Sequence, residues 1–120
     1  MPIIDIEMVT ERPGPAEPRL SRDLADALGE VLGQPSGKVW VRLRELSYGS
    51  YAENNVAKPP YPVFVNVLAS APPEGRELET LAIAITEAVA NLTRRPAENV
   101  HVIFQPAARG RIAFGGKLSK

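Results

Sequence analysis

The chain has 120 residues, 44% of them hydrophobic, which is enough for one soluble domain with a core. Its 14 basic and 14 acidic side chains cancel, so charge gives no reason to expect nucleic acid or a membrane as a partner. The absence of cysteine excludes disulfides and thiolate catalysis, and the single histidine argues against a metal site. The sequence has neither a signal-like start nor an apolar run long enough to span a membrane, so we expect a cytoplasmic protein.

The first half of the chain predicts a strand, a helix and a second strand. Apolar and polar residues alternate over 2–8, which is typical of a strand with one buried face. An amphipathic helix is predicted over 18–32, ending before Gly33 and Pro35. Its apolar positions are Leu20, Leu24, Leu28 and Val31. Alternation returns over 39–44 and predicts the second strand.

The second half repeats this order. A strand is predicted over 62–68, headed by Pro62 sixty residues after Pro2, and another over 100–102. Between them a helix from about 77 to 93 carries its apolar residues 61 positions after those of the first helix. We assign the one-residue change of offset to the loop 69–75, where a change of length costs little. The prediction is one domain, 1–120, made of repeats at about 1–58 and 59–120.

Two tandem β-α-β repeats predict an α/β (α+β) fold with a four-stranded sheet and two helices on one face. The other face of the sheet is then bare. The second helix is also apolar nearly all round, at 81–85, which is more than one sheet face requires. Both features predict a homo-oligomer in which sheets pack against each other.

The proline after Met1, the β-α-β repeats and the Gly115-Gly116 hairpin together resemble the tautomerase superfamily, and more narrowly the 4-oxalocrotonate tautomerases. The shortest members of that family are single β-α-β units, and this chain resembles the longer, trimeric members in which two units are fused. The resemblance covers nearly the whole chain. It implies the fold of tautomerases and of macrophage migration inhibitory factor, a homotrimer, and an isomerase that uses neither a cofactor nor a metal.

The resemblance also implies a set of site residues. Pro2 matches the catalytic N-terminal proline, provided that Met1 is removed. Arg12, ten residues later, matches a substrate-binding arginine, and Tyr51 matches an aromatic wall of the pocket. The family's arginine in the middle of the second strand is replaced here by Trp40 and His101. The further candidates for binding a small carboxylate-bearing substrate are Arg42, Arg44, Arg76 and Arg111.

A free Pro2 would carry a secondary amine, and an α-amine has a pKa of about 8 that burial and neighbouring cations lower. We therefore predict a general base that moves a proton within a small 2-oxo or 2-hydroxydienoic acid, while arginine binds the carboxylate. Pro62 lies within the chain, so its nitrogen is an amide without basicity. One proline site per chain follows.

Two alternatives remain. In the first, a cationic proline acts as an acid in a dehalogenase, hydratase or decarboxylase, and Asp5, Glu7 or Glu53 activates water. In the second, the protein is a non-catalytic, oligomeric ligand-binding protein, which the missing mid-strand arginine favours. Arg12 would then be a solvated loop charge, and Tyr51 an aromatic residue of a hairpin or an interface.

Overall fold

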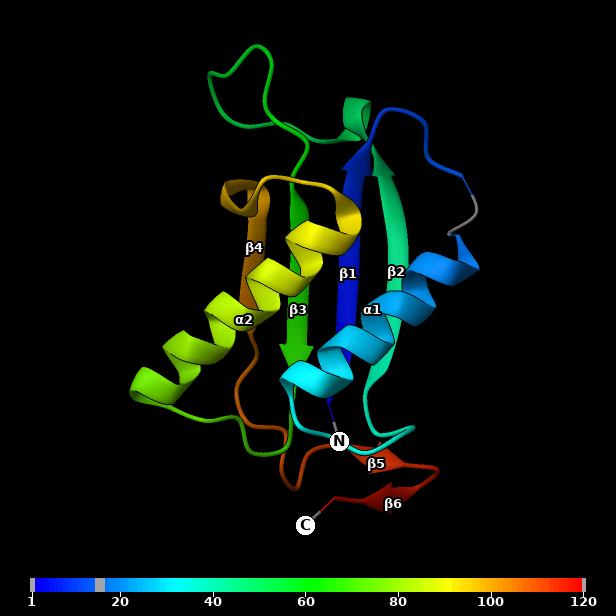
Figure 1. Cartoon of the computed structure of the whole chain (residues 1–120), viewed down its shortest axis with the longest axis vertical. Coiled ribbons are helices and arrows are strands. Elements are labelled where there is room, and N and C mark those ends of the chain that lie inside the picture. The colour runs from blue at the N-terminus through cyan, green and yellow to red at the C-terminus, as the bar shows by residue number, and fades with distance from the viewer. Residues whose placement is uncertain (1, 15–16, 120) are drawn as a thin grey trace.

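The computed structural model describes residues 2–14 and 17–119. In these residues a four-stranded mixed sheet has both long helices on one face (Figure 1). The strand order is β2-β1-β3-β4. The central strands β1 (Ile3–Thr10) and β3 (Val63–Leu68) are antiparallel, and β2 (Trp40–Ser47) and β4 (Val100–Phe104) flank them in parallel. The predicted fold class is confirmed.

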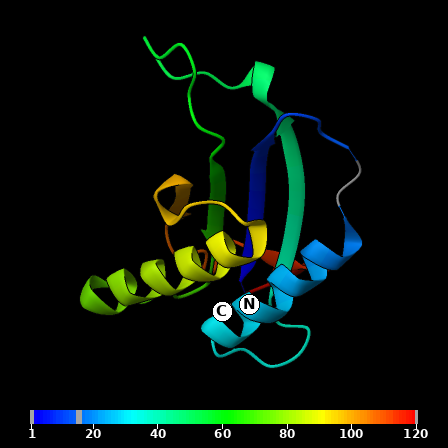
Figure 2. The same ribbon diagram turned by 45° about the horizontal axis from the view of Figure 1, so that its top comes forward.

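The helices α1 (Pro18–Val31) and α2 (Gly75–Thr93) form the second layer, which Figure 2 shows in front of the sheet. The core lies between the layers, because each helix turns its apolar stripe toward the sheet. Fully buried core residues include Leu24 of α1, Ile85 of α2 and Ile4 of β1. Neither helix is long and apolar enough to cross a membrane.

The register of the strands corrects the predicted alignment of the two halves. Ile4 of β1 is fully buried under the helices, whereas Phe64 of β3, sixty positions later, is only half-buried and lies on the face without helices, and the fully buried residue is Val65. Because side chains alternate along a strand, an offset of sixty would turn the second half of the sheet over. An offset of 61, as in the helices, superposes strands and helices together. Pro2 therefore corresponds to Val63 and not to Pro62, and the loop needs no change of length.

Four elements run further than the sequence pattern predicts, and the first of them is β1, which continues to Thr10. β2 runs to Ser47, because it pairs with β1 as far as Thr10. β4 runs to Phe104, which pairs with Val67 of β3. α2 begins at Gly75, two residues before the predicted start at about 77, so Arg76 lies in its first turn.

The face of the sheet without helices, here called the open face, carries side chains from all four strands. They are Asp5, Glu7, Trp40, Arg42, Arg44, Phe64, Asn66, His101 and Ile103. The predicted hairpin is present as β5 (Ala113–Phe114) and β6 (Lys117–Leu118). Its turn residues both have positive φ, 59° and 88°, which suits two glycines. The hairpin contacts Trp40 through Phe114, with the ring centroids 5.4 Å apart.

A long connection joins the two halves. After a short 3₁₀ turn, Tyr48–Ser50, the segment 51–62 forms neither helix nor strand and projects from the end of the sheet opposite the hairpin (Figure 1). Its tip, 54–58, is exposed throughout. Its base is fixed, because the Tyr48 hydroxyl donates to the Pro59 carbonyl at 2.6 Å and the Tyr48 and Tyr61 rings stack.

Candidate functional site

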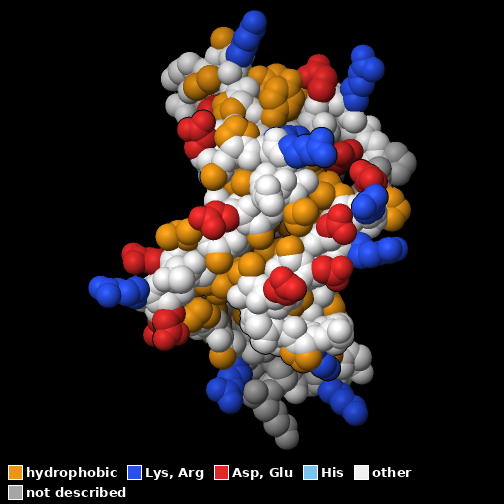
Figure 3. Space-filling view, viewed as in Figure 1, with side chains coloured by type: hydrophobic (Ala, Val, Ile, Leu, Met, Phe, Trp, Pro, Cys, Tyr) orange, Lys and Arg blue, Asp and Glu red, His pale blue; other side chains and the backbone are white. Residues whose placement is uncertain are grey.

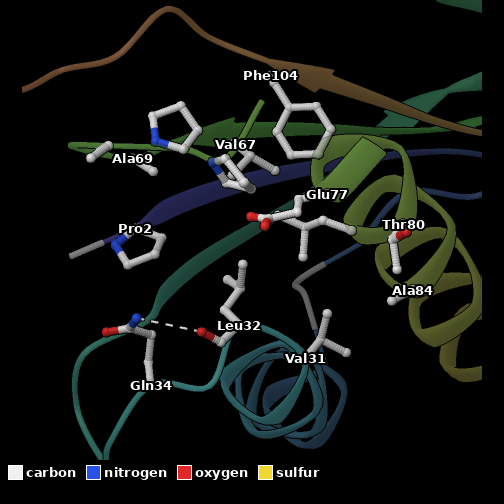
Figure 4. Close-up of a pocket in the computed structure, with 14 residues that line it drawn as sticks. Pro2, Val31, Leu32, Gln34, Val67, Ala69, Glu77, Thr80, Ala84 and Phe104 are labelled. Atoms are coloured by element: carbon white, nitrogen blue, oxygen red, sulfur yellow. Dashed lines mark hydrogen bonds between the residues drawn. The ribbon is translucent and has the colours of Figure 1, made fainter. Parts of the chain in front are cut away.

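A cavity of about 430 Å³ lies beside the start of β1, between the end of α1 and the first half of α2 (Figure 4). Most of the residues that line it are apolar, and they come from both repeats. They are Pro2, Val31, Leu32, Gln34, Val67, Ala69, Ala71, Pro72, Pro73, Glu77, Thr80, Leu81, Ala84 and Phe104. Seen from the helix side, hydrophobic side chains also gather between the two helices (Figure 3). The cavity therefore lies at one end of the strip of apolar side chains between the two helices.

Pro2 is a buried wall of this cavity. Its carbonyl accepts a hydrogen bond from the Trp40 backbone N–H at 3.1 Å, which ties it to the start of β2. The ring fixes φ, so the position of the proline nitrogen is set by the strand that follows. The predicted catalytic residue is thus held in place beside a space large enough for a small ligand.

Glu77 extends from α2 into the same space, and in Figure 4 its carboxylate points from the helix toward the side where Pro2 lies. Sequence reasoning missed this residue. An acidic side chain in the first turn of a helix is common, because it complements the helix dipole, and it carries no separate signal. Only the fold shows that this turn borders Pro2.

Gln34 was also missed, although its place in the repeat is informative. It follows α1 as Arg95 follows α2, and both backbone N–H groups bond five residues back, to Gly29 and Ala90. The Gln34 amide donates to the Leu32 carbonyl at 3.4 Å and lines the cavity.

Arg95, at the other end of the sheet, reaches further than Gln34. Its guanidinium donates to the carbonyls of Val9, at 2.8 Å, and Tyr61, at 2.7 Å. Burial lowers the pKa of Arg95, against the opposing effects of Glu45 and Tyr61. The long side chain of Arg95 thus links β1 to the segment before β3, whereas the shorter side chain of Gln34 borders a cavity.

Two of the predicted arginines lie on the open face. Arg42 donates to Asp5 with two bonds, at 2.6 and 2.8 Å, and this pairing raises the pKa of Arg42. Arg44 pairs with Glu7 at 3.6 Å. The cavity is on the helix side, so within one chain these side chains do not meet Pro2. Asp5 and Glu7, two of the carboxylates predicted to activate water, are therefore engaged in these ion pairs.

Arg12 and Tyr51 lie at the far end of the sheet from Pro2. Arg12 is exposed in the loop after β1, and Tyr51 follows the turn after β2. The Tyr51 hydroxyl donates to Glu53 at 2.6 Å, which raises the pKa of Tyr51 to about 12. Since β1 has eight residues, it spans roughly 26 Å. One chain therefore does not bring Arg12 or Tyr51 to its own Pro2.

The remaining candidates lie nearer to Pro2 but do not line the cavity. Arg76 is exposed in the first turn of α2, next to Glu77. Arg111 is exposed in the turn before the hairpin, which lies at the Pro2 end of the sheet (Figure 1). No group of three His, Asp or Glu side chains among the described residues could hold a metal ion. Met1, whose removal the sequence predicts, lies outside the described residues.

Neither a protein-family model nor a curated protein sequence matches this chain. Solved structures match over almost its full length. A fused 4-OT (4-oxalocrotonate tautomerase) solved as a symmetric trimer is 21% identical, with a TM-score of 0.74 over 98% of this chain and 94% of that one. A homologue of macrophage migration inhibitory factor from Prochlorococcus marinus is 16% identical, with a TM-score of 0.74 over 98% and 99%. The FG41 malonate semialdehyde decarboxylase is 20% identical, with a TM-score of 0.66 over 94% and 88%. The chain has the fold of the tautomerase superfamily.

Proposed function

We propose that this protein, which has the tautomerase fold, is a cofactor-free tautomerase whose general base is Pro2 after removal of Met1. The observation that carries the proposal is the placement of Pro2 in the wall of a largely apolar cavity. The proposed substrate is a small 2-oxo or 2-hydroxydienoic acid, and the proposed compartment is the cytoplasm.

In this mechanism the unprotonated Pro2 amine takes a proton from the enol hydroxyl, or from the carbon beside the carbonyl, of the bound acid. The electron pair moves through the conjugated system, and the same amine returns the proton to a carbon when the enol ketonises, or to the oxygen when the ketone enolises. The net reaction changes only the position of one proton and of the double bonds. The apolar lining disfavours the charged ammonium and so supports a base at cellular pH.

The site also requires a second copy of the chain in this proposal. The fused 4-OT named above is described as a symmetric trimer. In a homotrimer of this protein, Arg12 and Tyr51 of one chain would reach the Pro2 cavity of another, which a single chain does not achieve. Arg12 would then bind the substrate carboxylate, and Arg111, at the Pro2 end of its own chain, is a further donor.

One observation favours a second candidate function. Glu77 puts a carboxylate in the cavity, and a nearby negative charge favours the cationic form of an amine. Pro2 as an acid, with Glu77 activating water, would support a hydratase or decarboxylase. The pH profile of kcat/KM separates the two functions. It rises with pH through the pKa of Pro2 if Pro2 is a base and falls through it if Pro2 is an acid.

The decisive experiment combines intact mass with enzyme assays. We expect the mature protein to lack Met1 and to ketonise phenylenolpyruvate or 2-hydroxymuconate. The Pro2→Ala variant, which keeps a free but unconstrained amine, should lose about 100-fold in kcat/KM. A retained Met1 excludes both proline mechanisms. Equal rates for wild type and variant exclude Pro2 as the catalyst.

A further inference from the structure

The charge of the Pro2 cavity is unusual for a carboxylate-binding site. Among the described residues that line it, Glu77 is the sole side chain that carries a charge. Gln34 and Thr80 are polar but neutral, and no arginine or lysine contributes to the lining. The chain's own contribution to the electrostatics of the site is therefore negative.

The position of this charge matters as much as its sign. Glu77 is an exposed residue of α2, and its carboxylate points from the helix across the cavity toward the side where Pro2 lies (Figure 4). Around it are apolar side chains such as Val67, Leu81 and Phe104. A ligand that places one end beside Pro2 and extends into the cavity meets Glu77 and these apolar groups.

The chemistry of that far end follows from the lining. A ring or branched alkyl group would be removed from water against apolar side chains, which is favourable by about 25 cal/mol per Å². A second carboxylate would lose part of its hydration against the apolar lining and face the exposed Glu77 carboxylate, and like charges at short range repel. The cavity, at about 430 Å³, has room for a small acid with one ring.

We propose that Glu77 is a specificity-determining residue of the Pro2 cavity: it excludes ligands with a second carboxylate and selects monocarboxylates with an apolar body. This inference rests on the proposed function in that it takes the cavity as the substrate site. It narrows the substrate class to 2-oxo monoacids with an aryl or branched alkyl substituent.

Binding of two unreactive acids tests the inference without any chemistry. Hydrocinnamate has one carboxylate and a phenyl ring, and adipate is a chain of similar length with two carboxylates. Isothermal titration of the wild-type protein should give hydrocinnamate the lower Kd, by about tenfold or more. Glu77→Gln keeps the size of the side chain and removes the charge, so it should strengthen adipate binding by about fivefold and leave hydrocinnamate nearly unchanged.

A matched control is available on the same helix. Glu79 is exposed like Glu77 but does not line the cavity, and Glu79→Gln changes the net charge by the same amount. The ratio of the two Kd values should stay at its wild-type value in this variant. A change of the ratio in Glu77→Gln alone then reports the cavity and not the overall charge.

The inference and the proposed function fail in different ways. If hydrocinnamate binds selectively but Pro2→Ala does not lower turnover, the proposed function fails and the role of Glu77 in selectivity stands. Tighter binding of adipate, no saturable binding of either acid, or an unchanged ratio in Glu77→Gln overturns the inference. In the catalytic arm, Glu77→Gln should raise kcat/KM for 2-hydroxymuconate relative to phenylenolpyruvate.

Discussion

At the scale of single residues, the pKa of the Tyr61 phenol depends on the carboxylate of Glu11. The phenol donates to Glu11, and this bond, with burial and the negative charge of Glu11, raises the pKa of Tyr61 to about 12 from its usual value of 10. The folded protein therefore holds this proton more tightly than the unfolded chain does. The stability that this contributes is complete below pH 10 and is lost as the pH rises through about 12.

We therefore expect the free energy of unfolding to fall less steeply between pH 10 and pH 12 in Tyr61→Phe than in wild type. Urea titrations across this range measure the two slopes. Glu11→Gln supplies the control, because the phenolate absorbance of Tyr61 should then appear at lower pH. Equal slopes for wild type and Tyr61→Phe would refute the role of the Tyr61–Glu11 bond.

Residues also differ in how far the sequence foretells their role. Pro2 is predictable because the family resemblance is carried by its position, and the structure places it beside a cavity. Glu77 and Gln34 are not predictable in this way. Their part in the cavity arises where the start of α2 and the end of α1 meet β1, which no local pattern encodes. That Arg12 is remote from Pro2 likewise becomes visible only when the direction of β1 is known.

At the scale of elements, the two helices end in the same backbone geometry with different residues. Gly33 after α1 has φ 62°, and Arg94 after α2 has φ 58°. Glycine adopts this left-handed conformation without strain, whereas a residue with a Cβ pays about 1 kcal/mol. A Cβ on Gly33 would meet nothing within 4 Å, so the difference is one of backbone conformation alone.

Substitutions at Gly33 and Arg94 should change the free energy of unfolding in opposite directions. Gly33→Ala should destabilise the fold by about 1 kcal/mol, and Arg94→Gly should stabilise it by up to about 1 kcal/mol. Chemical denaturation measures both free energies of unfolding. A stabilising Gly33→Ala, or a clearly destabilising Arg94→Gly, would show that side-chain contacts of these positions dominate over backbone strain.

Hydrophobic periodicity predicted all the main elements, and their ends less well. The predicted end of α1, at residue 32, is within one residue of the observed end at Val31, because Gly33 interrupts the apolar pattern. β2 and β4 were predicted too short, since their later residues are held by pairing with β1 and β3 and not by their own alternation. The two prolines sixty apart suggested a repeat offset that the faces of the strands contradict.

At the scale of the whole molecule, the open face determines the proposed assembly. Trp40 and Ile103 are 43% and 46% exposed on it, on opposite edge strands. In the proposed homotrimer this face is covered, because large exposed apolar side chains on a sheet favour association. The ion pairs of Arg42 and Arg44 lie between these edges and the centre of the sheet.

We expect light scattering after size exclusion to give three times the chain mass of 13.0 kDa. Ile103→Glu should shift the protein toward the monomer, because a charge would be buried in the contact. Ile83→Glu is the matched control: Ile83 is 61% exposed on α2, away from the open face, and its substitution should leave the mass unchanged. A monomeric wild type would contradict the assembly, as would a trimer that tolerates Ile103→Glu.

The exposed tip 54–58 of the connection has a consequence for the continuity of the chain. The two halves are joined mainly by other means: β1 pairs with β3 from Ile3–Leu68 to Met8–Val63, and the two helices pack together. Limited proteolysis at this tip should therefore leave two fragments that stay associated as a heterodimer. The new end of the second fragment would lie ahead of both Pro62 and Val63, so the cut would create no second proline amine at the position equivalent to Pro2. The connection thus links the halves covalently but is not needed to hold them together. The difference between the halves is independent of it, because it lies in the strands of the sheet themselves.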